Sequence, residues 1–279
     1  MLSSVQKTKL KEILKDDAGK GDVTGSLVPK KKVVAEIVAE DSCVLAGVEE
    51  AAFILQSSGL KTKILKKDGQ RSNHYDKVIR VSGSNHALYK AERAALNVLS
   101  RMSGVATICA KAAKIARKAS SGKTQVSVTR KTLPGFNEFD KKAAGLGSAL
   151  PHRKNLSDKV LFKSNHLKYL SIPNAVKHSK KRFPRLEVEV EVESPKEVQE
   201  AATAMPTTIM LDNMKIEQAK KAIQEIRKTN RESKIEISGG VSFENLSKYA
   251  KLKPDVISMG LLTNSAPSKS FGMELVKNG

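Results

Sequence analysis

Polar and charged residues recur at one kind of position in the second half of this 279-residue chain: at the end of a short aliphatic run, or directly after it. The residues at these positions are Thr129, Arg130, Lys131, Lys163, Glu191, Asp212, Ser238, Gly239, Gly240 and Gly260. Each aliphatic run predicts a β-strand. Because parallel strands bring their carboxyl ends to one face of a barrel, we expect these side chains to meet there.

Two kinds of charge occur in this set and its surroundings. Five side chains carry a positive charge or can acquire one: Arg130, Lys131, His152, Arg153 and Lys163. A group of cations in a cleft suits carboxylates and phosphates, with arginine acting as a fork and lysine as a point charge. The carboxylates Glu191 and Asp212 end consecutive predicted strands, and such a pair suits Mg²⁺ or the hydroxyls of a ribose.

A glycine pair adds a third feature. Ser238-Gly239-Gly240 precedes a predicted helix, where free backbone N–H groups favour a phosphate. The combined pattern predicts a pocket for a phosphorylated sugar beside a small polyanionic acid. Each residue alone has a plainer explanation: His152 could be structural, and Glu189, Glu191 and Glu193, which alternate along one strand, could line a solvated edge. Inside a barrel these glutamates would have to be paired or functional.

The elements that would position these residues alternate regularly after residue 105. Strands are predicted at 125–128, 159–162, 186–192, 208–211, 234–237 and 255–259, and helices at 106–118, 172–182, 195–204, 215–229 and 242–251. Such an alternation predicts a parallel α/β sheet or barrel. The first part of the chain is mixed, with a helix in the opening 15 residues, strands at 33–39 and 77–82, and helices at 47–57 and 86–102.

Bulk composition narrows the class of protein. Hydrophobic residues make up 39% and charged residues 28% of the chain, which suits a folded core. No apolar run is long enough for a membrane span, and the two cysteines form no C-x-x-C pair, so we expect a cytoplasmic location and no membrane partner. The net charge of +21 is spread along the chain and aromatic residues are only 4%, which argues against nucleic acid as the main ligand.

Several motifs resemble one known family, quinolinate phosphoribosyltransferase, also called nicotinate-nucleotide pyrophosphorylase (carboxylating). The resemblance covers almost the whole chain. The motifs that carry it are Gly21-Asp22-Val23-Thr24, Glu92-Arg93-Ala94-Ala95-Leu96-Asn97, Thr129-Arg130-Lys131-Thr132-Leu133-Pro134-Gly135, His152-Arg153, Lys163-Ser164-Asn165-His166, Glu189-Val190-Glu191-Val192, Leu211-Asp212-Asn213-Met214 and Ser238-Gly239-Gly240.

This resemblance implies an architecture: an α/β N-terminal domain (1–105) packed on an incomplete α/β barrel (106–267), with the tail 268–279 returning to the first domain. The resemblance also implies a reaction of NAD biosynthesis, in which quinolinate and phosphoribosyl pyrophosphate give nicotinate mononucleotide, pyrophosphate and carbon dioxide. It also implies a homodimer in which Arg93 reaches the neighbour's site; assembly beyond the dimer is left open.

The resemblance assigns roles to the strand-end residues. The acid-binding residues are Arg93, Thr129, Arg130, Lys131, His152, Arg153 and Lys163. Glu191 and Asp212 match the side that binds ribose and Mg²⁺, and these two together with Lys131 are the expected catalytic residues. Ser238, Gly239, Gly240 and Gly260 match the phosphate-binding positions.

The chain departs from the family pattern at Val128, Gly145, Pro151 and Ser164, and at Gly147-Ser148-Ala149 in place of a glycine triplet; we expect these positions to lie around the acid pocket. These departures leave open an enzyme of the same fold acting on another aromatic acid, either nicotinate or the substrate of the paralogues associated with molybdenum transport. A non-enzymatic binder of anions or nucleic acid is a further alternative, but a basic surface alone would not require carboxylates at two strand ends.

Overall fold

The structure is a computed structural model that describes residues 2–276. Its contacts divide the chain into two compact units, each described here by itself. The first comprises residues 2–110, 138–147 and 266–276, and the second comprises 111–137 and 148–265. Residues 277–279 of the predicted tail lie outside the described residues.

The second unit is built on a six-stranded sheet. Its strands are β6 (Gln125–Ser127), β7 (Val160–Phe162), β8 (Val188–Val192), β9 (Thr208–Asp212), β10 (Lys234–Ser238) and β11 (Val256–Ser258). The order is β6-β11-β10-β9-β8-β7, and every pair is parallel. Because β6 and β7 form the two ends and do not pair in the described structure, the result is the predicted incomplete barrel.

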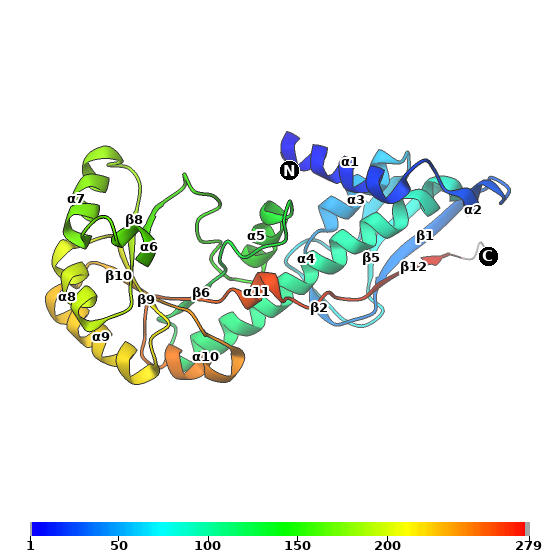
Figure 1. Cartoon of the computed structure of the whole chain (residues 1–279). Coiled ribbons are helices and arrows are strands. Elements are labelled where there is room, and N and C mark those ends of the chain that lie inside the picture. Colours follow the sequence, from blue (N-terminus) through cyan, green and yellow to red (C-terminus); the bar gives the residue numbers. More distant parts are fainter. Residues whose placement is uncertain (1, 277–279) are drawn as a thin grey trace. The chain divides into compact units, whose positions relative to one another are not determined.

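Helices cover the outer side of these strands, as Figure 1 shows for α7, α8 and α9. The helices of this unit are α6 (Ser164–Leu167), α7 (Ile172–Arg182), α8 (Pro195–Ala204), α9 (Ile216–Thr229), α10 (Phe243–Ala250) and α11 (Leu261–Asn264). Local chemistry sets their starts: the Ser194 hydroxyl accepts a hydrogen bond from the Glu197 amide, and the Glu197 carboxylate accepts one from the Ser194 amide. Apart from the helix predicted at 106–118, the strands and helices predicted for this part of the chain are present with small shifts at their ends.

Strand β8 illustrates how the barrel interior receives its polar side chains. Its sequence alternates valine and glutamate, so the glutamates lie on one face and the valines on the other. All five residues are buried. A pair of buried carboxylates in a barrel core requires partners, and they are found among the side chains of the site.

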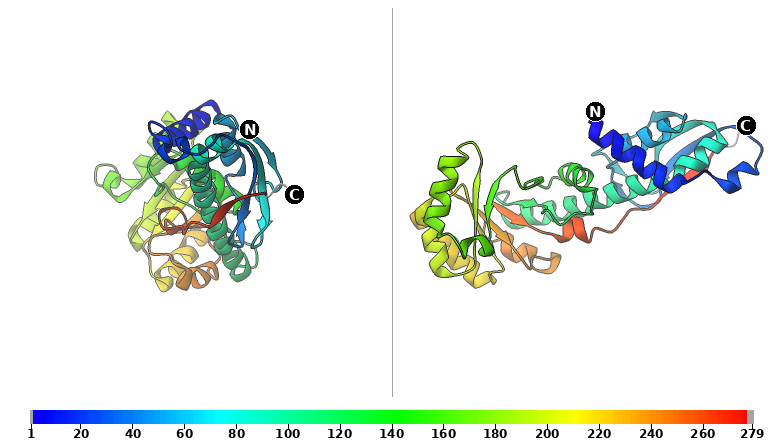
Figure 2. Two further views of the ribbon diagram at one scale, coloured as in Figure 1. Left: turned by 90° about the vertical axis from the view of Figure 1, so that its right-hand side faces the viewer. Right: turned by 45° about the horizontal axis from the view of Figure 1, so that its top comes forward.

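The first unit holds an antiparallel sheet of order β12-β1-β5-β3. Its strands are β1 (Lys32–Ala39), β3 (Lys61–Ile64), β5 (Lys77–Ser84) and β12 (Phe271–Leu275), with β2 (Cys43–Val44) and β4 (Arg71–Ser72) forming a separate pair. The helices α1 (Ser4–Ala18), α2 (Val23–Ser26) and α3 (Val48–Ser57) accompany it. Strand β12, from the end of the chain, lies beside β1 with Ala39 opposite Phe271 (Figure 2).

The two helices predicted at 86–102 and 106–118 are one helix, α4 (Asn85–Ala119). The prediction of two separate helices was wrong, because the helix continues through Gly104 without a break. Gly104 has another role: a Cβ built there would lie 2.1 Å from the backbone oxygen of Pro267. Glycine is needed for the close approach of the returning chain, and the helix runs on through it.

The sequence did not predict α5 (Asn137–Leu146), whose residues 138–146 belong to the first unit. Two buried ion pairs hold it there. Asp140 accepts hydrogen bonds from Arg101 at 3.0 and 2.9 Å, and Lys142 donates to Glu50 at 2.9 Å. The apolar residues on its buried side are few, Phe139, Ala143 and Ala144, and charged residues lie among them, so the helical periodicity is weak in the sequence.

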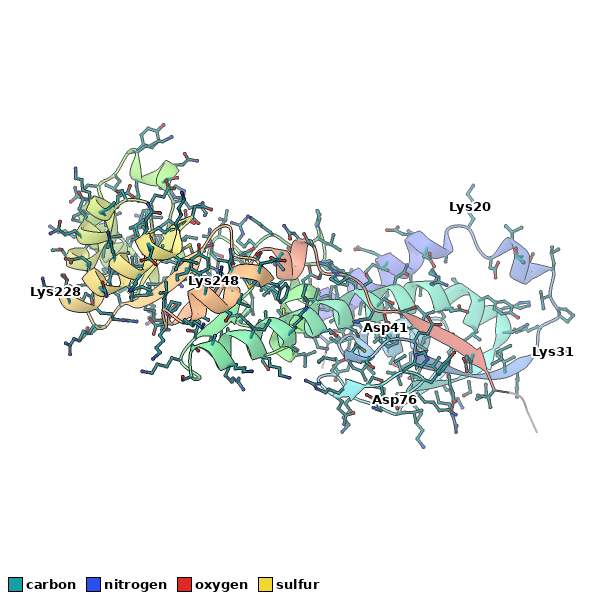
Figure 3. All side chains as sticks on the ribbon, turned by 90° about the horizontal axis from the view of Figure 1, so that it is seen from below. Lys20, Lys31, Asp41, Asp76, Lys228 and Lys248 are labelled. Atoms are coloured by element: carbon teal, nitrogen blue, oxygen red, sulfur yellow. The ribbon has the colours of Figure 1, made fainter. Side chains whose placement is uncertain are left out.

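The surface carries the excess of basic residues in both units. Lys20 and Lys31 of the first unit and Lys228 and Lys248 of the second are exposed (Figure 3). Among the described residues, no helix is both long and apolar enough to cross a membrane.

Candidate active site

A cavity of about 510 Å³ opens at the carboxyl ends of the barrel strands. Its lining includes most of the strand-end residues picked out from the sequence: Thr129, Arg130, Lys131, His152, Arg153, Lys163, Glu191, Asp212, Ser238, Gly239, Gly240 and Gly260. The remaining lining includes Leu161, Met210 and Val241 as apolar surface. One cavity in the second unit thus gathers cations, carboxylates and a glycine pair from six strands.

Glu191 and Asp212 follow each other around the barrel at the ends of β8 and β9. Glu191 is buried and forms an ion pair with Lys163 at the end of β7. Burial raises the pKa of Glu191; Lys163 opposes that shift, while Asp212 adds to it. Asp212 is partly exposed and accepts a hydrogen bond of 2.8 Å from Asn213 Nδ2. The negative charges of Glu191 and Asp212 therefore repel each other across adjacent strands.

The glycine pair has the backbone that its sequence predicts. Gly239 and Gly240 have φ values of 79° and 61°, which glycine adopts readily and other residues rarely do. A Cβ at Gly239 would lie 2.3 Å from Asn213 Oδ1 and 2.7 Å from the Asn213 backbone nitrogen. The backbone N–H of Asn213, a residue at φ 54°, donates a hydrogen bond of 2.9 Å to the backbone oxygen of Ser238. Two tight turns at the ends of β9 and β10 thus pack directly against each other.

Lys131 is held at the cavity wall through its backbone. Its amide donates to Thr129 Oγ1 at 3.1 Å, and its carbonyl accepts from Thr263 Oγ1 at 2.7 Å. A Cβ at Gly260 would lie 2.9 Å from Lys131 Cδ, so the lysine stem passes over that glycine. The side chain is exposed, which leaves its ammonium group available to an anion.

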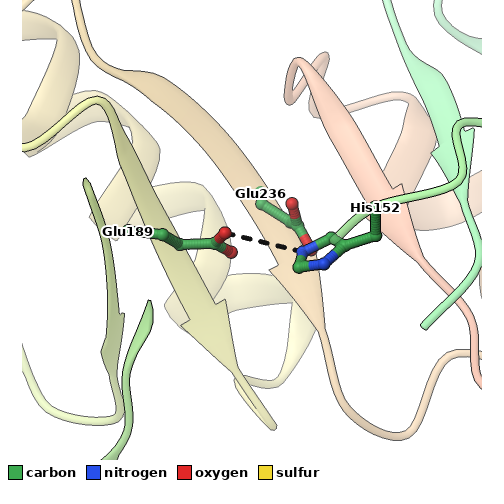
Figure 4. Close-up of side chains that lie close together, drawn as sticks. All are labelled: His152, Glu189 and Glu236. Carbon is green, nitrogen blue, oxygen red and sulfur yellow. Dashed lines mark ion pairs between the residues drawn. The ribbon is translucent and has the colours of Figure 1, made fainter. Parts of the chain in front are cut away.

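Figure 4 shows His152 between Glu189 of β8 and Glu236 of β10. His152 Nε2 lies 3.5 Å from a carboxylate oxygen of each glutamate. Glu189 also pairs with Lys159 Nζ at 2.7 Å, and Glu236 accepts a hydrogen bond from the Ser258 hydroxyl. Burial alone would lower the pKa of His152, but the two carboxylates raise it to about 9. The imidazole is therefore a cation at neutral pH.

Two family models match the chain. The model described as the C-terminal domain of quinolinate phosphoribosyl transferase matches residues 105–274, and the model of the N-terminal domain matches 22–103. The chain belongs to the quinolinate phosphoribosyl transferase family.

Relatives and solved structures of the family resemble the chain over almost its full length. The probable nicotinate-nucleotide pyrophosphorylase (carboxylating) of Methanocaldococcus jannaschii is 36% identical, covering 96% of each chain, and the rat enzyme of that name is 35% identical, covering 92% of this chain and 85% of its own. The crystal structure of NadC from Streptococcus pyogenes has a TM-score of 0.89 at 33% identity, covering 99% of this chain and 98% of its own. The structure from Francisella tularensis has a TM-score of 0.93 at 27% identity, covering 99% and 98%.

One predicted site residue of this family member, Arg93, is not among the residues that line the cavity. Arg93 belongs to the first unit, where its exposed side chain lines a separate hollow with Asn97, Ser100 and Lys269. Its predicted role toward a neighbouring subunit stays a prediction. Glu193 also leaves the set: it follows the end of β8, is exposed, and lines a groove with residues of α8 and α9 rather than the barrel interior.

The four single-residue departures from the family pattern are absent from the described cavity lining. Val128 is fully buried in the core, and Pro151 and Ser164 are exposed. Gly145 lies on α5 in the first unit, where a Cβ would meet no atom within 4 Å. The substrate of the chain therefore cannot be inferred from these four residues by their place in the cavity lining.

The sequence did not point to three residues of the group around His152 and Glu189: the charged residues Glu236 and Lys159, and Ser258, whose hydroxyl donates to Glu236. Glu236 alternates with Ile235 and Ile237 in β10, which looks like the pattern of a half-exposed strand. A signal was present, because a strand in the middle of a parallel sheet is covered on both faces, so a charged residue there requires a partner.

Proposed function

We propose that the chain is a nicotinate-nucleotide pyrophosphorylase (carboxylating), which makes nicotinate mononucleotide, pyrophosphate and carbon dioxide from quinolinate and phosphoribosyl pyrophosphate in NAD biosynthesis. The observation that carries the proposal is the gathering of a cationic group, two carboxylates and a glycine pair around one cavity. The names of the relatives support the same reaction.

The cationic side of the cavity binds the acid. Arg130, Lys131, His152, Arg153 and Lys163 offer more positive charge than one carboxylate needs, and quinolinate carries two. Arg153 is buried, so its guanidinium contacts a ligand with little competition from water. These residues orient the pyridine nitrogen toward the anomeric carbon of the sugar.

The opposite side binds the phosphorylated sugar. The turn at Gly239 and Gly240 and the backbone near Gly260 leave room for phosphate oxygens to approach main-chain N–H groups. Lys131 faces the same space and stabilises negative charge as pyrophosphate leaves. No covalent attachment to the protein is required, because the reaction is catalysed by positioning and electrostatics.

The oxygens of Glu191 and Asp212 fit Mg²⁺, which prefers a few carboxylates together with substrate phosphates. The fit rests on the donor set: two carboxylates at adjacent strand ends, one of them buried with a raised pKa. When bound, Mg²⁺ would neutralise charge on the pyrophosphate. Lys163, now paired with Glu191, would then be available to the acid.

The active enzyme is a homodimer in which Arg93 of one subunit serves the acid pocket of the other. Support comes from the exposure of Arg93 and from its match to the family motif. A two-fold dimer uses the same surface twice, so each site would lend and borrow one arginine. Higher assembly and the cytoplasmic location stay predictions.

The test is formation of nicotinate mononucleotide by the purified chain from quinolinate, with nicotinate as the alternative acid. Turnover of quinolinate with release of one carbon dioxide per pyrophosphate supports the proposal. Turnover of nicotinate alone would assign the chain to a same-fold enzyme for a monocarboxylate, and binding of either acid without turnover would assign it to the non-enzymatic alternative.

A further inference from the structure

His152 combines two features that rarely occur together. Its backbone has φ 52°, a left-handed conformation that non-glycine residues rarely adopt. Its ring is mostly buried, and its Nε2 points between two carboxylates from different strands. A strained backbone that persists at a cavity wall indicates that the position of the side chain matters.

The two glutamates beside the imidazole ring of His152 differ in their other partners. Glu189 and Glu236 are both buried, and Lys159 is the lysine that faces them, pairing with Glu189. Glu236 has the neutral Ser258 hydroxyl as its hydrogen-bond donor. Arg153 adds positive charge beyond ion-pair distance, but no lysine or arginine among the described residues forms an ion pair with Glu236, and a buried carboxylate without a cationic partner is costly in a low-dielectric interior. An imidazolium at His152 supplies that partner.

A metal ion is the other way to balance these charges, since the ligand atoms of His152, Glu189 and Glu236 lie within 4.8 Å of one another. The neighbours argue against it. The Lys159 ammonium is 2.7 Å from the Glu189 oxygen nearest the ring, and the Ser258 hydroxyl already donates to the Glu236 oxygen that faces it. A cation beside the ion would repel it, whereas both contacts are compatible with an imidazolium.

We propose that Glu236 is a positioning residue that keeps His152 cationic and oriented at the wall of the cavity, so that its imidazolium binds a carboxylate of the pyridine substrate. This inference rests on the proposed function for the identity of the acid. Glu236 and His152 both line the cavity, whereas Glu189 lies deeper, paired with Lys159. Glu236 thus acts on the substrate through His152.

A pH dependence follows from this arrangement. The charged groups that face His152 are Glu189 from β8, Glu236 from β10, Lys159 before β7 and the adjacent Arg153. The pKa of His152 lies at about 9, so the imidazolium is present at neutral pH and is lost as the pH rises through that value. Affinity for the acid should fall over the same interval.

The kinetic test compares Glu236→Gln with the matched control Glu232→Gln, an exposed glutamate in the turn before β10. The amide keeps the shape of the side chain but removes its charge. We expect Glu236→Gln to raise KM for quinolinate by nearly tenfold at pH 9.5, with KM for phosphoribosyl pyrophosphate within about twofold, because at a pH above the pKa of His152 each unit by which that pKa falls lowers the imidazolium fraction by up to tenfold. The fall of kcat/KM for quinolinate at high pH should also move toward neutral pH. Unchanged KM and an unchanged pH profile in a folded variant would overturn the proposal.

A second measurement uses the wild-type chain and does not depend on turnover. The nitrogen chemical shifts of ¹⁵N-histidine report the protonation of each of the five histidines, and His152→Asn assigns the relevant signals. We expect both ring nitrogens of His152 to be protonated at pH 8. A neutral ring at pH 7 would overturn the proposal even if quinolinate is turned over, and so would Zn²⁺ or Mn²⁺ binding that is lost in His152→Asn. If both ring nitrogens of His152 are protonated but quinolinate is not turned over, the result counts against the proposed reaction and not against the charge state of His152.

Discussion

Lys163 and Glu191 form a direct ion pair across the cavity wall, joining the ends of β7 and β8. Lys163 belongs to the group of cations that suits the acid, and Glu191 to the carboxylates that suit the metal and the ribose. Each therefore neutralises the other until ligands separate them. The two halves of the site are coupled through this pair, which makes single substitutions on either side informative.

Replacing Lys163 by alanine should weaken quinolinate binding more than binding of phosphoribosyl pyrophosphate. A hydrogen bond to a charged group is worth about 1.5–3 kcal/mol, which corresponds to roughly a tenfold to hundredfold rise in the dissociation constant. Calorimetric titration of each ligand measures both constants. Lys168→Ala, an exposed lysine at the end of α6, is the matched control and should change neither. An equal loss for both ligands would show that the acid pocket is misplaced.

Asp212→Asn should lower kcat while leaving the fold intact. The amide keeps the size of the side chain but removes the charge that Mg²⁺ and the ribose hydroxyls would meet. We expect wild-type activity to disappear in excess chelator and to return with Mg²⁺, and the variant to need more Mg²⁺ for half-maximal rate. Full activity of the wild type in chelator, with unchanged circular dichroism, would show that the reaction does not need Mg²⁺.

Two neighbouring glycines should respond differently to alanine. At Gly240 a Cβ meets no atom within 4 Å, so Gly240→Ala adds only the left-handed strain of about 1–2 kcal/mol. At Gly239 the Cβ also collides with the Asn213 backbone, so Gly239→Ala must displace the turn that faces the phosphate. We expect a larger drop in Tm and a larger rise in KM for phosphoribosyl pyrophosphate at Gly239. Equal effects at both positions would contradict the packing described for this turn.

Mixing Arg93→Ala with Lys163→Ala should restore activity if the dimer shares its sites. In each mixed dimer one site would carry both lesions and the other neither. Since half the dimers are mixed, activity should return to about a quarter of wild type.

The control for this complementation mixes Lys163→Ala with Asp212→Asn, two lesions of the same unit. Each site of a mixed dimer then carries one lesion, and no activity should return. If native mass spectrometry shows that subunits exchange but the Arg93 mixture stays inactive, Arg93 serves its own chain.

Much of the barrel could be predicted because its periodicity is local. Aliphatic runs ended by polar residues located the strands, and the helices predicted at 172–182, 195–204 and 242–251 match α7, α8 and α10 to within one residue. The cavity followed from the same rule, since parallel strands deliver their carboxyl ends to one place.

What could not be predicted depends on contacts between distant segments. The reason for a glycine at position 104 inside α4 is the close approach of Pro267, far along the chain. Helix α5 is held by Arg101 and Glu50 through charges that no periodicity reveals. The importance of Glu236 became visible only when His152 and Glu189 were found beside it. Each case joins residues whose relation is set by the fold.

The central claim is that this cavity joins quinolinate to a phosphoribosyl group and releases carbon dioxide. Its most direct test incubates the purified chain with Mg²⁺, phosphoribosyl pyrophosphate and quinolinate labelled in the 2-carboxylate, and follows nicotinate mononucleotide and labelled carbon dioxide together. The account predicts equal amounts of both products, loss of both in Arg153→Ala, and no mononucleotide from nicotinate. Mononucleotide formed from nicotinate and not from quinolinate would contradict it.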